Sequence, residues 1–109
     1  MLEIRYYMAP GGRQPFGEWF AELEAVAQAK ATRAMVRLAQ GSFSNVKSVG
    51  EGVLEYRIDF GPGYRVYFGR DGEMLVILLT GGTKKRQQRD IDAAHSFWQD
   101  YKQSKRGRR

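Results

Sequence analysis

The spacing of apolar residues predicts a first strand and then a long helical stretch. Residues 2–8 are rich in β-forming side chains and end at Ala-Pro-Gly-Gly, which is typical of a short strand followed by a turn. Between Phe16 and Ala39, apolar residues recur every three or four positions, as in an amphipathic helix. The flanks change from acidic to basic along this stretch, which favours two helices that break near residues 25–29 over one continuous helix.

The second half of the chain predicts three strands and a final helix. Residues 42–52 are polar and read as a loop, and the predicted strands are Val53–Phe60, Tyr64–Gly69 and Met74–Leu79, with turns at 61–63 and 71–72. The continuously apolar run at Met74–Leu79 is typical of a central strand that is covered on both faces. From Lys85 to Tyr101, apolar residues return to helical spacing.

This order, β-α-α-β-β-β-α, predicts an α+β fold. We expect a small antiparallel sheet with an N-terminal helical hairpin and a C-terminal helix, the helices lying on one face. The length of 109 residues fits one domain, which we place at residues 1–103. Residues 104–109 form a basic tail that we expect to be disordered.

The Gly-Pro-Gly turn at residues 61–63 suggests a register for the hairpin around it. If Phe60 faces Tyr64, then Arg57 lies opposite Tyr67, Asp59 lies opposite Arg65, and apolar residues pair with apolar ones. One face of this hairpin then carries charged groups and a tyrosine. An ordinary cross-strand ion pair between Asp59 and Arg65 is the simplest explanation of that face, and it is worth about 0.2–1 kcal/mol.

Charge is distributed unevenly along the chain. The net charge is +6, and residues 1–83 are balanced, so the whole excess lies in residues 84–109 with nine Lys or Arg and three Asp. A concentrated positive field favours a polyanion or an acidic protein as partner. The chain has no cysteine, no apolar run of the roughly 20 residues that a membrane span needs, and no secretory signal at its start. We therefore expect a cytoplasmic protein that does not bind membranes.

Four stretches make the chain resemble a known family of toxins. They are GEGVLEYRI at residues 50–58, GPGYRVYF at 61–68, LTGGTK at 79–84 and QRDI at 88–91. Together they resemble the RelE/ParE superfamily, and in particular the HigB-like addiction-module killer proteins, over nearly all of residues 2–102. The resemblance implies a type II toxin that is neutralised by a cognate antitoxin. RelE-like members cleave messenger RNA at the ribosome without a metal.

The resemblance also implies which residues act. Arg65 matches a phosphate-stabilising arginine, Arg57 lies near a position where some members carry a catalytic lysine, and Lys84 lies in a loop that supplies another basic group. Cleavage without a metal uses the ribose 2′-hydroxyl as nucleophile, and arginine matches phosphate in a planar fork. We therefore assign Arg57 and Arg65 as phosphate clamps and Lys84 as base or additional clamp, with no cofactor or metal. The predicted RNA-binding residues are Tyr64, Tyr67, Lys85, Arg86 and Arg89.

Two alternatives remain open at this point. A ParE-like protein would inhibit DNA gyrase without cleaving RNA, and a protein that keeps only the fold would bind a partner. Departures from the nuclease pattern favour these alternatives: Asp59 stands where some members have a second lysine, and residues 88–91 replace an early-helix tyrosine. The single histidine, His95, is expected to be structural or exposed rather than catalytic. The sequence does not indicate an oligomeric state.

Overall fold

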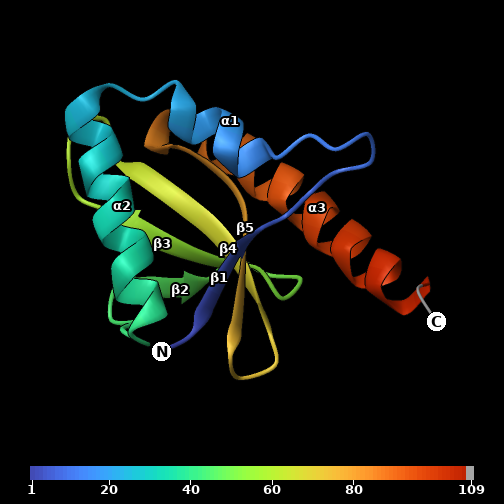
Figure 1. Ribbon diagram of the computed structural model, residues 1–109. Helices are drawn as coiled ribbons and strands as arrows, with labels where there is room; N and C mark the ends of the chain where they lie inside the picture. The colour runs from blue at the N-terminus through green and yellow to red at the C-terminus, as the bar shows by residue number, and fades with distance from the viewer. Residues whose placement is uncertain (108–109) are drawn as a thin grey trace.

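The computed structural model describes residues 1–107, which form a five-stranded sheet between two helical layers (Figure 1). This confirms the predicted α+β class. The elements are β1 (Glu3–Tyr6), α1 (Pro15–Ala21), α2 (Ala25–Ala39), β2 (Val46–Ser48), β3 (Leu54–Ile58), β4 (Tyr64–Asp71), β5 (Leu75–Thr83), the 3-10 turn η1 (Lys84–Arg86) and α3 (Gln87–Gly107).

The helical stretch is a pair of helices, as the charge flanks predicted, but it breaks slightly earlier, at residues 22–24. Proline at the first turn of α1 suits a helix start because its fixed φ matches the helix and its missing N–H has no partner there anyway. Both helices cover one face of the sheet. Phe16 of α1 and Leu38 of α2 are fully buried against Val66 and Phe68 of β4.

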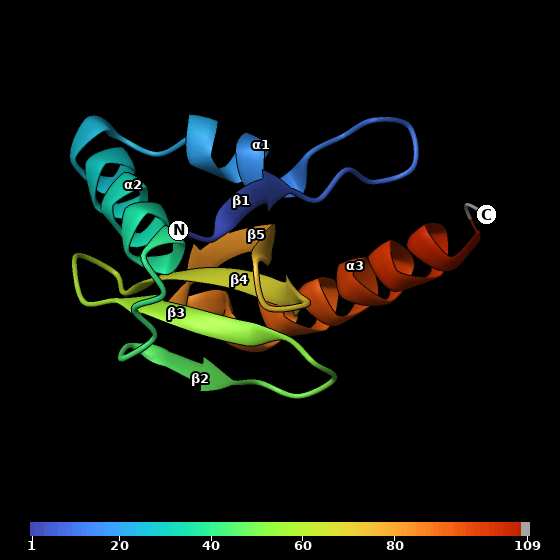
Figure 2. The same ribbon diagram turned by 60° about the horizontal axis from the view of Figure 1, so that its bottom comes forward.

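The C-terminal helix covers the opposite face, so the prediction that all helices lie on one face is wrong. Ile91 and Trp98 of α3 pack against Tyr67, Ile77 and Leu79. Since β5 is apolar on both sides, it needs a helix on each face to keep its side chains out of water. Figure 2 shows α3 on the far side of the sheet from α1 and α2, with its C-terminal part extending past the strands.

The strand order is β1-β5-β4-β3-β2, and β1 pairs with β5 in parallel. The sheet is therefore mixed, whereas the sequence predicted a purely antiparallel one. The strand β2 lies in the stretch that was read as a loop. It has only three residues and is mostly exposed at the sheet edge, so it carries little hydrophobic signal.

The β3–β4 hairpin has the predicted faces but a register that differs by two residues. Arg57 lies opposite Arg65, and Glu55 lies opposite Tyr67. The predicted pairs, Arg57 with Tyr67 and Asp59 with Arg65, are therefore wrong. A shift of two residues leaves every side chain on its original face, so the charged face of the hairpin survives the correction.

The shift arises because the turn is wider than a tight Gly-Pro-Gly turn. Strand β3 ends at Ile58, and residues 59–63 form the connection. Within it, the Phe60 amide donates to the Ile58 carbonyl at 2.9 Å and the Gly63 amide donates to the Phe60 carbonyl at 3.0 Å. Asp59 thus stands in the turn rather than on the strand.

A bulge in the β4–β5 pairing sets the position of the Gly81-Gly82 pair. The register shifts between Tyr67 and Phe68, so Gly81 lies opposite Val66 and Gly82 lies opposite Arg65. A side chain at Gly81 would collide with the Trp19 ring of α1, and one at Gly82 would collide with the Asp90 carboxyl of α3. The two glycines therefore let both helical layers approach the end of β5.

Helix α3 continues through residues 104–107, where the sequence analysis predicted a disordered tail. The last two residues of that tail, 108 and 109, lie outside the described residues. Lys105 of this helix end donates to the Asp71 carboxylate at 2.6–2.7 Å, which ties it to the end of β4. Within residues 1–107, no helix combines the length and the apolar character that crossing a membrane requires.

Candidate functional site

The structure brings the three predicted catalytic residues to one end of the sheet. Arg57 is the register partner of Arg65. The Gly63 carbonyl accepts from Arg65 Nη1 at 2.7 Å and from the Lys84 backbone amide at 2.9 Å. One carbonyl thus joins the β3–β4 turn to the end of β5. We call Arg57, Arg65 and Lys84 the cationic cluster.

Members of this cluster differ in their access to solvent. Arg57 and Lys84 are exposed, and within residues 1–107 neither side chain has a hydrogen bond or an ion pair. Arg65 is only 5 % exposed. Its Nε is buried without a hydrogen bond and lies 3.9 Å from Glu55 Oε2. Arg57 and Lys84 can therefore contact a ligand directly, whereas the side chain of Arg65 is buried below the surface.

Glu55 is the centre of a buried polar network beside this cluster. Its side chain is 1 % exposed, and Oε2 accepts from the Tyr67 hydroxyl at 2.9 Å and from Gln87 Nε2 at 2.8 Å. Lys47 Nζ lies 3.8 Å from the other oxygen. Burial and the bond to Glu55 raise the pKa of Tyr67 well above its ordinary value, so its hydroxyl stays protonated and donates. The network links β3 and β4 to the start of α3.

Asp90 is a second acidic group under the first turn of α3. Its Oδ2 is buried, packs against Gly82 and has no hydrogen bond within the described part of the chain. Burial raises the pKa of this carboxyl, and the positive charges of Arg86 and Arg89 oppose that shift only in part. Asp90 therefore tends toward its neutral form.

The remaining predicted cations surround the N-terminus of α3. Lys85, Arg86 and Arg89 are exposed, and they continue from Lys84 into the first turn of the helix. Cations at a helix N-terminus are electrostatically unfavourable because they meet the positive end of the helix dipole. The same end attracts anions. The location of these residues therefore favours a negatively charged ligand over a purely stabilising role.

The two predicted RNA-binding tyrosines lie on opposite faces of β4. Tyr67 is fully buried under α3, so it has no ring surface for a base to stack on. Tyr64 is partly buried on the other face, where its ring packs against Trp19 and Phe60. Tyr67 is therefore joined to the cationic cluster only through the buried Glu55, and Tyr64 lies on the opposite face from it.

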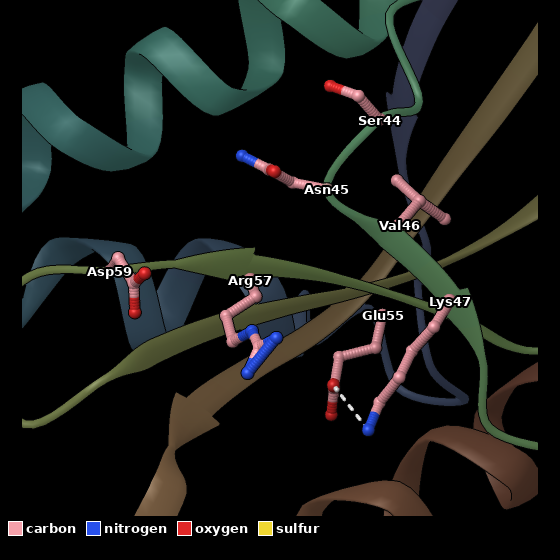
Figure 3. Close-up of a pocket in the computed structure, with 7 residues that line it drawn as sticks. All are labelled: Ser44, Asn45, Val46, Lys47, Glu55, Arg57 and Asp59. Atoms are coloured by element: carbon pink, nitrogen blue, oxygen red, sulfur yellow. Dashed lines mark ion pairs between the residues drawn. The ribbon is translucent and has the colours of Figure 1, made fainter.

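A pocket of about 200 Å³ opens beside Arg57 at the β2–β3 edge (Figure 3). In the close-up, Arg57 and Asp59 point to the same side of β3, Lys47 meets Glu55, and Asn45 extends toward α2. Helix α3 packs mainly against β4 and β5, and it reaches β3 through the hydrogen bond from Gln87 to Glu55. The pocket gives a ligand access to the outer side of the cluster.

Sequence reasoning missed Glu55 as a structural centre, together with Gln87 and Asp90. The sequence placed Glu55 on the charged face of the hairpin. Its burial comes from α3, which is distant in the sequence and covers that face only after folding. A carboxylate in a strand between Val53 and Arg57 was the one available signal. Within residues 1–107, no three His, Cys, Asp or Glu side chains lie together as a metal site would need. His95 Nε2 donates to the Val49 carbonyl at 2.9 Å, as a structural residue does.

Comparisons with known proteins link the chain to one family. Residues 18–96 match the family model described as phage-derived protein Gp49-like, and this range contains the whole cationic cluster. An uncharacterized protein from Haemophilus influenzae is 43 % identical over 86 residues, which cover 78 % of this chain and 87 % of the relative.

Proposed function

We propose that this chain, which belongs to the phage-derived Gp49-like family, is the toxin of a type II toxin–antitoxin pair. In this proposal it is a cytoplasmic, ribosome-associated endoribonuclease that cleaves messenger RNA and is neutralised by a cognate antitoxin. The resemblance of its motifs to HigB-like killer proteins and the exposed cations at one end of the sheet both support this function.

The observation that carries the proposal is that two exposed cations, Arg57 and Lys84, lie on the elements to either side of Arg65 at one end of the sheet. Arg57 and Lys84 have no anionic partner in the described chain, although their elements bring them to the same end of the sheet. The buried Arg65 adds a third positive charge, which Glu55 balances only in part, since Glu55 Oε2 lies 3.9 Å from Arg65 Nε. Such an arrangement attracts a phosphate, because two exposed cations beside a buried third concentrate positive charge at one end of the sheet.

The proposed reaction is an attack of the ribose 2′-hydroxyl on the adjacent phosphorus. The bond between the 2′-oxygen and phosphorus forms while the bond between phosphorus and the 5′-oxygen breaks. The leaving 5′-oxygen takes a proton from water, which yields a 2′,3′-cyclic phosphate and a 5′-hydroxyl end. Arg57 binds a phosphate oxygen and Lys84 takes the 2′-hydroxyl proton or binds a second oxygen. Arg65 holds the turn that presents both groups.

Cleavage mapping in a reconstituted translation reaction tests this function. Wild-type protein should cut a defined message only when ribosomes are present, and an Arg57→Gln/Lys84→Gln variant should lose at least about 100-fold in cleavage rate. An Arg5→Gln/Arg13→Gln variant has the same net charge and should cut normally, because these residues sit in exposed ion pairs away from the cluster. Normal cutting by the Arg57/Lys84 variant would refute the assignment.

Burial of Tyr67 favours a second candidate, a gyrase inhibitor of the ParE type without cleavage chemistry. With Tyr67 buried, the cationic cluster has no tyrosine hydroxyl to act as the acid for the leaving oxygen. Inhibition of gyrase-catalysed supercoiling, together with intact messages in the translation reaction, would replace the nuclease proposal by this one.

A further inference from the structure

A second basic groove lies between α2 and the exposed end of β3, and Arg57 is the one residue that it shares with the predicted site. It has a volume of about 170 Å³. Three cations of α2 line one wall, Lys30, Arg33 and Arg37, and Asn45, Arg57 and Asp59 line the other. Arg57, Asn45 and Asp59 also line the pocket of Figure 3, so the groove meets the outer side of the cationic cluster.

The three α2 cations lie together without an acidic neighbour on their helix. Their spacing of three and four residues places them on one helix face, where like charges repel one another. Helix α2 contains no acidic residue that would offset them. Lys30 lies 5.0 Å from the centre of the Phe60 ring, while Arg33 and Arg37 have no side-chain partner within residues 1–107. Such an arrangement favours an anion supplied from outside the chain.

The chemistry of the groove favours RNA over an acidic protein segment. Lys30 and Arg37 are separated by about 10 Å along α2, so the row can follow a chain of several negative charges. The partly exposed Phe60 ring closes one end of the groove, with Lys30 over it and Tyr64 stacked beside it. Because Arg57 lines the groove as well as the cationic cluster, an RNA strand with one phosphate at the cluster places its neighbouring phosphates along this row. A positively charged groove that follows the backbone is typical of single-strand binding, and Asp59 can accept a hydrogen bond from a ribose 2′-hydroxyl.

We propose that this groove binds the phosphate backbone of a single-stranded RNA segment that flanks the bound phosphate at the cationic cluster. Arg33 and Arg37 each contact one phosphate. The inference rests on the proposed function insofar as the ligand is RNA. It adds a binding track that runs from Arg57 along α2.

Fluorescence anisotropy with a labelled twelve-nucleotide oligouridylate, without ribosomes, tests the groove. Each phosphate contact to a single strand contributes about 0.7 to the slope of log affinity against log salt, so Arg33→Gln/Arg37→Gln should lower that slope by about 1.4. Urea denaturation checks that the same variant stays folded, as expected for two exposed side chains without a side-chain partner in residues 1–107. The charge-matched control is Arg5→Gln/Arg13→Gln, whose residues pair with exposed glutamates elsewhere.

An unchanged salt slope in the Arg33/Arg37 variant overturns the proposal, and so does an equal loss in the control, which would mean that binding follows net charge alone. A loss of binding to a labelled oligoglutamate with unchanged RNA binding also overturns it and identifies a protein-docking surface. Failure of the proposed function is distinguishable. If the protein binds the oligonucleotide through Arg33 and Arg37 but never cuts a message, the RNA-binding groove stands and the nuclease function is refuted.

Discussion

At the scale of single residues, the site depends on a buried carboxylate that never reaches the ligand. Glu55 accepts from Tyr67 and Gln87 and lies near the guanidinium of Arg65. Removing one partner of a buried charged network leaves the others unpaired, which is more costly than removing an exposed pair. Glu55 therefore holds Arg65, and through it the Gly63 turn, in place.

Replacing this carboxylate should destabilise the protein strongly. Glu55→Ala should lower the free energy of unfolding by about 3–5 kcal/mol, because it leaves the buried charge of Arg65 without its nearby anion and the Tyr67 hydroxyl without its acceptor. Urea denaturation measures the change, with Glu73→Gln on the exposed β4–β5 turn as control. If Glu55→Ala unfolds at the same urea concentration as the control, the network does not support the site.

The buried carboxyl of Asp90 should make the stability of the protein fall as the pH rises. Its pKa is raised in the folded state by burial, so the folded protein holds the proton more tightly than the unfolded chain. Its contribution to stability is fully present below the ordinary pKa of 3.8 and is lost as the pH rises through the higher folded value. The stability of Asp90→Asn relative to wild type should therefore increase with pH.

Urea denaturation at about pH 3.5 and about pH 7 checks this difference. The control is Asp92→Asn on the exposed face of the same helix, which should show no such trend. A difference between Asp90→Asn and wild type that stays constant between the two pH values would contradict the assignment of burial as the cause.

At the scale of elements, the end of β5 is where both helical layers meet the sheet. Gly81 accommodates the Trp19 ring of α1 and Gly82 accommodates Asp90 of α3. Because β5 continues directly into η1, the packing of these glycines fixes where Lys84 begins. The position of the site thus follows from close packing at two residues without side chains.

Gly81→Ala should therefore lower the free energy of unfolding by about 1–3 kcal/mol, which is the usual cost of overpacking. A Trp19→Phe change in the same chain should recover part of the loss, because it shortens the ring that the new methyl group meets. Gly107→Ala at the end of α3 has no atom within 4 Å of its new methyl group and serves as control. An unaltered thermal midpoint for Gly81→Ala would show that the sheet end is looser than described.

Local patterns predicted the elements that carry a strong repeat, and failed where pairing is non-local. Alternation placed Arg57 and Arg65 on one face correctly, and helical spacing located α2 and α3. The register was wrong by two residues because the turn takes five residues, and a polar, three-residue strand such as β2 has almost no signal. The parallel pairing of β1 with β5 joins distant parts of the chain, which no local pattern encodes.

At the scale of the whole molecule, two helical layers protect the sheet and leave its charged end open. Within the basic stretch at residues 84–109, the cations at this end are Lys84, Lys85, Arg86 and Arg89, whereas residues 90–101 of α3 carry three Asp and no Lys or Arg. The charge count did not indicate the basic row on α2, because the charges of residues 1–83 sum to zero. Only the fold shows that the cations of α2 lie apart from the acidic residues of that stretch. The candidate site was therefore predictable in its residues, but the groove beside it was not.

The most direct test of the central claim is the chemistry of the RNA ends. Fragments from a reconstituted translation reaction with wild-type protein should carry 2′,3′-cyclic phosphates and 5′-hydroxyl groups, because the ribose 2′-hydroxyl is the proposed nucleophile. The same fragments should be almost absent with Arg57→Gln/Lys84→Gln and present with Arg5→Gln/Arg13→Gln. Ends with a 3′-hydroxyl and a 5′-phosphate, or an uncut message with folded wild-type protein, would contradict the account.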